Sequence, residues 1–122
     1  MATRSRIAVE LSDGTVKSVY CHWDGYPDGV GQDLLNRGFY STNQVEDFID
    51  EGSRSTVDES YHEKYGESRG EDFIHPTVHE SVDDYFDSDI EEYGYLYNQD
   101  GEWIVKSAHH PYGEPKELEE VL

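Results

Sequence analysis

Cysteine is almost absent from the chain, and so are long apolar runs. The single cysteine, Cys21, cannot form an intramolecular disulfide, so nothing in the sequence indicates an oxidising compartment. The apolar run near the N-terminus is short and is broken by Glu10, which is untypical of a signal peptide or a membrane-spanning helix. We therefore expect a cytosolic protein without a transmembrane segment.

Basic residues are scarce as well. The 122 residues include 9 Lys and Arg against 28 Asp and Glu, which gives a formal net charge of -19. Residues 1–50 carry a net charge of -4, and residues 51–122 carry -15. A field of this sign repels nucleic acids and anionic membranes and attracts basic protein surfaces. The alternative is that the acids only keep the protein soluble.

Common catalytic motifs are also missing: there is no glycine-rich phosphate loop, nucleophile elbow or paired cysteine motif. Cys21 and His22 are adjacent, so on a strand their side chains point to opposite faces and cannot act as a nucleophile and its base. His75 and His79 have the spacing of a helical metal site, but Pro76 disfavours a helical conformation at His75. We therefore predict a protein that is not an enzyme and has no cofactor or metal site.

The chain is long enough to form one hydrophobic core, and it has many aromatic residues to fill that core. Hydrophobic residues make up 34% of the sequence and aromatic residues 13%. Large rings bury much area per residue, and a chain of this size usually forms one domain. We predict a single domain over residues 1–122 with a core rich in Tyr, Phe and Trp.

Two segments read as β-hairpins. Residues 7–11 and 16–21 alternate between apolar and polar positions around an Asp13-Gly14 turn. Residues 92–97 and 103–107 form the second predicted hairpin, in which Tyr93, Tyr95 and Tyr97 share one face.

Three segments have helical patterns. Residues 30–37 present apolar side chains at helical spacing and are followed by Gly38. Ser41 and Gln44 form a capping box before a helix that ends at Gly52, with three residues predicted to face inward: Val45, Phe48 and Ile49. Residues 77–86 are predicted to form a third helix with a capping box of Thr77 and Glu80 and four inward residues: Val78, Val82, Tyr85 and Phe86.

These elements predict a small α+β domain with the order ββααβ(α)ββ. The two hairpins are expected to form one antiparallel sheet with the short helices packed on one face. Residues 53–76 are predicted to form a long acidic loop, with a short strand at residues 61–65 as the alternative. Residues 108–122 are predicted to form a mobile tail, in which residues 115–122 form a frayed turn or helix. Arg4 and Arg6 are expected to pair with acids from the second half of the chain.

An acidic arc, residues 58–92, is the first candidate site. It holds 13 acids against Lys64 and Arg69, a net charge of -11, with aromatic residues between them. Carboxylates on a rigid surface can present a field like that of DNA to a nucleic-acid-binding protein. The predicted partner-binding residues are Asp58, Glu59, Glu63, Glu67, Glu71, Asp72, Glu80, Asp83, Asp84, Tyr85, Asp87, Asp89, Glu91 and Glu92.

The segment at residues 20–29 is the alternative site. Its glycines and Pro27 redirect the chain from sheet to helix, and Trp23 and Tyr26 are expected to pin this corner to the core. A pocket here would suit an anionic, ring-bearing ligand such as a nucleotide. The predicted pocket residues are His22, Trp23, Asp24, Tyr26 and Arg69.

Four segments are distinctive: residues 1–5 (Met-Ala-Thr-Arg-Ser), residues 19–27 (Val-Tyr-Cys-His-Trp-Asp-Gly-Tyr-Pro), the leucine pair at 34–35, and the closing hairpin at 92–103. In these segments the chain resembles a family of small uncharacterised proteins found in bacteriophages, prophages and their bacterial hosts. Residues 65–71 look like a degenerate form of a family segment that has Arg-Asp where this chain has Glu67 and Ser68. The resemblance implies a phage origin and no particular reaction.

Together, these observations favour a phage-derived inhibitor that acts in the cytoplasm of the infected bacterium. It is expected to bind a basic, nucleic-acid-handling host defence protein, such as a CRISPR effector or a restriction nuclease, and to block its nucleic-acid site by DNA mimicry. The first alternative is a small nucleotide- or anion-binding protein or enzyme that uses the pocket at residues 20–29. The second is an acidic assembly protein of the virion, and exposed aromatics are compatible with a homodimer.

Overall fold

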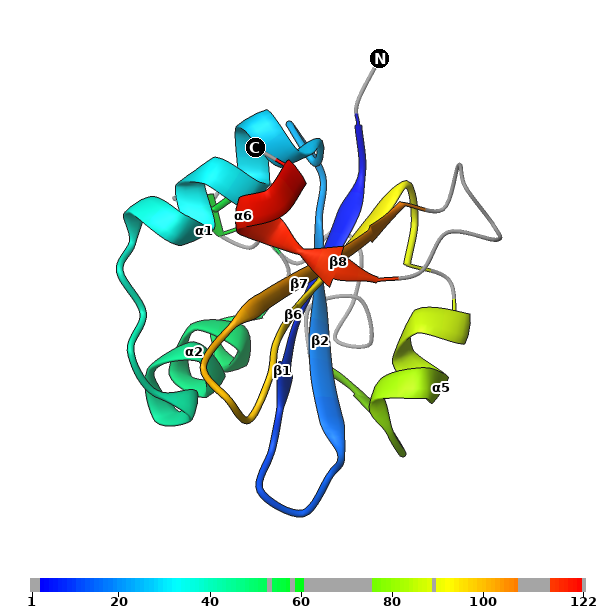
Figure 1. Cartoon of the computed structure of the whole chain (residues 1–122). Helices are drawn as coiled ribbons and strands as arrows, with labels where there is room; N and C mark the ends of the chain where they lie inside the picture. The colour runs from blue at the N-terminus through cyan, green and yellow to red at the C-terminus, as the bar shows by residue number, and fades with distance from the viewer. Residues whose placement is uncertain are drawn as a thin grey trace.

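One mixed β-sheet organises the chain (Figure 1). The structure is a computed structural model that describes residues 3–52, 54–57, 59–60, 76–88, 90–107 and 115–121. The strands lie in the order β4-β3-β2-β1-β6-β7-β8, and β5 also pairs with β2. Their bounds are β1 Ser5–Glu10, β2 Val16–Cys21, β3 Arg54–Thr56, β4 Glu59–Ser60, β5 Thr77–His79, β6 Tyr93–Tyr97, β7 Trp103–Ser107 and β8 Lys116–Glu117.

Both predicted hairpins are present. β1 and β2 are antiparallel, with Ile7 opposite Val19. Their turn is closed by Asp13, whose carboxylate accepts hydrogen bonds from the backbone N–H and the hydroxyl of Thr15 at 3.0 and 2.6 Å. β6 and β7 form the second antiparallel pair, with Tyr97 opposite Trp103.

The two hairpins join differently from the prediction. β1 and β6 are parallel, with Ile7 opposite Tyr95, so the expected all-antiparallel sheet is wrong. A parallel pair needs a long crossover, and the chain between β2 and β6 supplies one. In its described residues, that connection contains η1, α1, α2, α5 and strands β3 to β5, and it returns the chain so that β6 runs in the same direction as β1.

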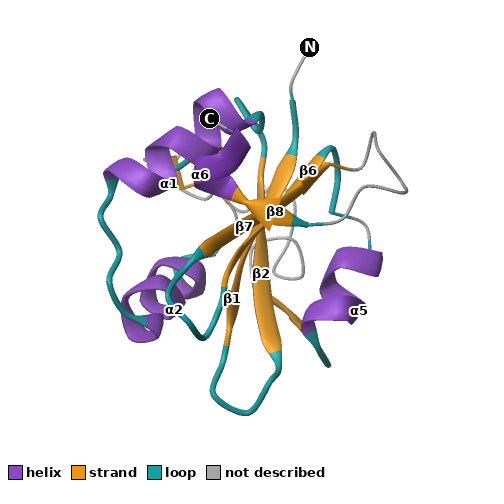
Figure 2. Ribbon diagram, in the orientation of Figure 1, coloured by secondary structure: helices purple, strands orange, loops and turns teal. Residues whose placement is uncertain are grey.

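Helices cover both faces of the sheet rather than one (Figure 2). The larger core lies on the face of Ile7, Val19 and Tyr95, beneath the π-helix η1 (Pro27–Gly31) and the helices α1 (Gln32–Asn36), α2 (Thr42–Asp50) and α6 (Leu118–Val121). The smaller core lies on the opposite face, where α5 (Val82–Asp87) packs Tyr85 and Phe86 onto Ala8 and Leu96. The prediction of helices on a single face is therefore wrong, because α5 follows β5 onto the other side of the sheet.

The first two predicted helices are confirmed. α1 ends just before Gly38, whose φ of +67° is the left-handed conformation that terminates helices. At the start of α2, the Ser41 hydroxyl accepts a hydrogen bond from the backbone N–H of Gln44 at 3.2 Å. The Gln44 side chain in turn accepts one from the N–H of Tyr40 at 2.8 Å.

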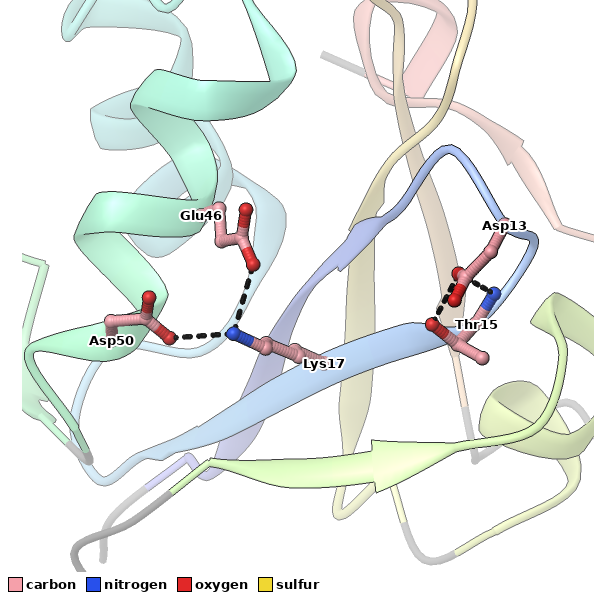
Figure 3. A network of polar contacts seen from close by, with 5 residues as sticks. All are labelled: Asp13, Thr15, Lys17, Glu46 and Asp50. Atoms are coloured by element: carbon pink, nitrogen blue, oxygen red, sulfur yellow. Dashed lines mark hydrogen bonds and ion pairs between the residues drawn. The ribbon is translucent and has the colours of Figure 1, made fainter.

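Lys17, the second residue of β2, ties α2 to the sheet (Figure 3). Lys17 Nζ lies 2.8 Å from Glu46 Oε2 and 3.1 Å from Asp50 Oδ1. The two acids are one helical turn apart, so a single ammonium group reaches both. The hydrogen bond to Glu46 is the main cause of the raised pKa of Lys17.

The predicted third helix begins later than the sequence pattern suggested. Residues 77–79 form β5, which pairs with Val16–Ser18 of β2, so Thr77 and Glu80 do not cap a helix. Thr and Val are β-branched and favour a strand here, and the N-cap of α5 is Ser81, which accepts from the N–H of Asp84 at 3.1 Å. Val78 is 64% exposed rather than inward.

The predicted loop and tail both contribute strands. Within residues 53–76, β3 pairs with β2 and β4 pairs with β3, while residues 61–75 lie outside the described part. The predicted terminal turn or helix is present as α6, but residues 116–121 are docked on the fold and do not form a mobile tail. β8 pairs with β7, and Leu118 at the start of α6 is fully buried. Leu118 directly follows β8, and its burial docks this short polar segment on the larger core.

None of the helices described in the structure combines the length and the apolar character needed to cross a bilayer.

Candidate functional site

The corner at residues 22–29 is held by hydrogen bonds to its backbone. The Gly25 N–H donates to the carbonyl oxygen of Thr3 at 2.8 Å, and the buried Tyr95 hydroxyl donates to the carbonyl oxygen of Gly25 at 2.6 Å. The Val30 N–H donates to the carbonyl oxygen of Asp24 at 2.7 Å. A Cβ atom at Gly29 would collide with that same oxygen. The corner is thus a preorganised turn in which Asp24 has a φ of +58°.

The side chains of this corner contact one another at the surface. The Tyr20 hydroxyl lies 2.6 Å from His22 Nδ1, and the His22 ring meets Trp23 edge-on with centroids 4.7 Å apart. The Tyr26 hydroxyl donates to Asp24 Oδ1 at 3.2 Å, and this bond raises the pKa of the Tyr26 phenol. Trp23 and Tyr26 are 36% and 42% exposed, so the prediction that they pin the corner to the core is wrong; backbone hydrogen bonds and Tyr95 do so.

Four of the five predicted pocket residues therefore lie together in one short segment: His22, Trp23, Asp24 and Tyr26. The fifth, Arg69, lies outside the described residues. Two surface hollows, of about 570 and 250 Å³, are lined by residues of other segments. Cys21 is fully buried in the larger core, and its thiol lies 3.9 Å from the carbonyl oxygen of Trp23.

The larger hollow, about 570 Å³, lies between the β1–β2 turn, the start of α2 and the β6–β7 turn. Its lining includes Asp13, Glu46 and Gln99. Gln99 closes one side, because its backbone N–H donates to Glu10 and its side-chain amide donates to the carbonyl oxygen of Leu11. The hollow is open and polar, which is typical of solvated surface between loops.

The described part of the acidic arc divides into exposed and engaged carboxylates. Glu80, Asp83, Asp84 and Asp87 are exposed on α5 and the turn before it. The arc's last two acids instead anchor the N-terminal strand: the Arg4 guanidinium lies 3.9 Å from Glu91 Oε2, and the Arg4 backbone N–H donates to Glu92 Oε2 at 2.7 Å. The expected pairing of Arg4 with distant acids is thus confirmed. Six predicted arc residues lie outside the described part, and Glu59 is described only as the start of β4; the six are Asp58, Glu63, Glu67, Glu71, Asp72 and Asp89.

Tyr85 is wrongly placed among the partner-binding residues. It is fully buried, and its hydroxyl donates to the carbonyl oxygens of Arg6 and Tyr95 at 3.2 and 3.0 Å. Burial raises the pKa of this phenol. Position 85 lies one residue after Asp84 on a short helix, so it faces the sheet while the neighbouring acids face solvent.

Sequence reasoning missed a polar network beneath α5. Ser18 Oγ lies 2.8 Å from His79 Nε2 and accepts a hydrogen bond from Arg6 Nε at 3.0 Å. Arg6 also donates to the Ser18 carbonyl oxygen and to Thr77 Oγ1. The sequence pattern predicts a helix at His79, and only the pairing of β5 with β2 brings this residue beside Ser18.

A hydroxyl beside an imidazole is the geometry of an activated nucleophile, but the network does not present one to a substrate. Ser18 is fully buried, and the Arg6 guanidinium already donates to its oxygen. Burial and the positive charge of Arg6 lower the pKa of His79, against a smaller opposing effect of Asp84. The arrangement satisfies buried polar groups between β2, β5 and α5.

Among the described residues, no group of three or more His, Cys, Asp or Glu side chains is arranged to hold a metal ion. Comparison with known proteins gives no significant match to a protein-family model, a curated protein or a solved structure.

Proposed function

We propose that this chain is an acidic inhibitor that binds a basic, nucleic-acid-handling protein and blocks its nucleic-acid site by DNA mimicry. The observation that carries the proposal is the set of exposed carboxylates on and before α5, in a chain of net charge -19. Within the described residues, Glu80, Asp83 and Asp87 have no ion pair that would neutralise them.

Rigid anchoring supports a role as a charge template. Tyr85 and Phe86 bury the inner side of α5, and the Tyr85 hydroxyl bonds the helix to two strands. Asp83 and Asp87 lie four residues apart, about 6 Å along the helix axis. Regularly spaced negative charge on a fixed support attracts a surface that has evolved to bind a nucleic-acid backbone.

The source and setting follow from the resemblance to phage and prophage proteins. A phage-derived inhibitor acts in the cytoplasm of the infected host, where the basic proteins that threaten phage DNA are its defence nucleases. The partner in this proposal is a CRISPR effector or a restriction nuclease, and the inhibitor itself is not an enzyme.

The test is inhibition of a panel of such nucleases by the wild-type chain and two charge-matched variants. Glu80→Gln/Asp83→Asn/Asp87→Asn should slow association with the inhibited nuclease about tenfold or more at low salt, because electrostatic steering is lost. Asp47→Asn/Asp100→Asn/Glu120→Gln removes three exposed charges elsewhere and should retain inhibition. Equal inhibition by all three proteins, or binding that is insensitive to salt, would refute the proposal.

The second candidate function is binding of a nucleotide or other ring-bearing anion at the corner. Two observations favour it. The Trp23 ring is exposed, and the neighbouring Asp24 has a positive φ, a backbone strain that clusters at functional sites. A ligand of this kind should raise the melting temperature of the wild-type chain but not of Trp23→Ala. No stabilisation by any nucleotide in a thermal-shift screen would reject this function.

A further inference from the structure

The smaller hollow, about 250 Å³, opens beside the last strand and helix. Its floor includes Leu35 and Phe39, at and just after the end of α1, and Trp103, the first residue of β7. Its rim carries Glu102, Glu117 and Glu119. The first of these precedes β7, the second ends β8 and the third lies in α6, so the fold brings Glu102 to the same hollow as two acids that follow it by 15 and 17 residues. Figure 1 shows α6 lying beside α1 above the sheet.

The floor is part of a row of packed aromatic rings. Trp103 is 7% exposed, and its ring centroid lies 5.3 Å from that of Tyr97 and 6.0 Å from that of Phe39. Phe39 in turn contacts Phe48 at 5.4 Å. At the far end of this row, the Arg37 guanidinium lies 5.0 Å from the Phe48 ring centroid. One end of the row therefore already carries a guanidinium from this chain, while two rings in the middle of the row, Phe39 and Trp103, line the hollow.

The rim is negative and unneutralised. Glu102, Glu117 and Glu119 are all exposed. Within the described part of the chain, no hydrogen bond or ion pair holds their side chains, and no Lys, Arg or His lines the hollow. A negative rim over an apolar aromatic floor repels phosphate and carboxylate groups and suits a cation that has an aliphatic stem.

We infer that this hollow is a docking site for an arginine side chain of a basic partner protein. The stem would lie against Leu35 and Phe39, and the guanidinium would lie near Trp103, where cation–π attraction operates. Its five N–H donors match several carboxylate acceptors in a way that the single ammonium of lysine does not. The inference is independent of the carboxylates on α5, because the hollow lies on the sheet face of the larger core.

The last residues of the described chain decide whether the hollow exists. Leu118, between Glu117 and Glu119, is fully buried. A Cβ atom at Gly31 would lie 2.8 Å from its Cδ1 atom, so Gly31 leaves the space into which Leu118 packs. The burial of Leu118 thus fixes the positions of Glu117 and Glu119, the residues before and after it.

Trp103 offers a direct readout. The chain has two tryptophans, so Trp23→Phe leaves Trp103 as the sole indole. We would titrate this variant with a short peptide of alternating Gly and Arg, following Trp103 fluorescence and its indole N–H resonance. A saturable change is expected. The same peptide with citrulline, which has the shape of arginine without its charge, should give none.

Matched variants assign the effect to the rim. In the Trp23→Phe background, Glu102→Gln/Glu117→Gln/Glu119→Gln should weaken peptide binding about tenfold, and Glu80→Gln/Asp83→Asn/Asp87→Asn should retain it. Unchanged far-ultraviolet circular dichroism would confirm that the rim variant folds. The inference is wrong if the peptide does not bind at saturable levels, if citrulline binds equally, or if both triple variants weaken binding alike.

Discussion

The side chain of His79 lies between a buried hydroxyl and charged groups of opposite sign. Ser18 Oγ contacts its Nε2 atom, while Arg6 disfavours and Asp84 favours the protonated ring. Desolvation is the largest effect and lowers the pKa of His79. The folded state therefore holds this imidazole in its neutral form at neutral pH.

The lowered pKa has a consequence for stability. As the pH falls through about 6.5, the unfolded chain takes up the proton before the folded chain does. The free energy of unfolding should therefore fall over this range until the pH passes the folded-state pKa. In His79→Gln, denaturant unfolding measured at pH 7.5 and 5.5 should show a smaller loss than in the wild type.

His22→Gln is the control for the His79 measurement, because it removes a histidine on the surface corner. Carboxylates have ordinary pKa values near 4 and contribute little above pH 5.5. If the free energy of unfolding changes with pH in the same way for the wild type and His79→Gln, then the pKa of His79 does not differ between the folded and unfolded chains.

At the scale of elements, the short C-terminal pair β8 and α6 depends on one side chain. β8 pairs with β7 through only two residue pairs, and a four-residue helix cannot be stable by itself. Leu118 is the fully buried residue that joins them to the larger core. Packing rather than helix propensity therefore holds this segment.

Leu118→Ala should lower the free energy of unfolding by about 2–5 kcal/mol, the cost of removing a buried leucine and leaving a cavity. Urea denaturation followed by circular dichroism measures the change. Val121→Ala removes an exposed apolar side chain from the same helix and should stay within about 0.5 kcal/mol of the wild type. Equal effects of the two substitutions would contradict the docking of α6.

At the scale of the whole molecule, the net charge of -19 must be held within one small domain. The Lys17 and Arg4 ion pairs neutralise a few carboxylates, but most of the charge is not compensated because bases are scarce. Mutual repulsion of like charges destabilises a compact state, and salt screens it.

Raising NaCl from 20 to 500 mM should therefore increase the melting temperature by roughly 4 °C or more. Surface charges become screened between these two concentrations. Differential scanning calorimetry in NaCl, and in sucrose of equal osmolality as an uncharged control, measures the effect. A melting temperature that is unchanged or lowered by NaCl would mean that attractive ion pairs outweigh repulsion in the folded state.

Local sequence patterns were sufficient for the hairpins and for α1 and α2. Alternation and an Asp-Gly turn predicted β1 and β2, and the Ser41 capping box predicted α2, because the interactions that decide these elements lie within a few residues. The corner at residues 20–29 was likewise visible in its glycines and Pro27. The sequence did not reveal whether Trp23 and Tyr26 face the core, because exposure depends on what packs above them.

By itself, the sequence determined the α+β class, the hairpins, the charge and the absence of an internal disulfide, because these follow from composition and from neighbours along the chain. Only the tertiary structure decided that β1 and β6 run parallel, that His79 joins Arg6 and Ser18, and that Glu102, Glu117 and Glu119 surround one hollow. The first two of these join residues far apart in the chain, and the third joins Glu102 to two acids that follow it by 15 and 17 residues. Their pairing is selected by burial of Tyr85 in the smaller core and of Tyr95 and Leu118 in the larger core, which no local pattern encodes.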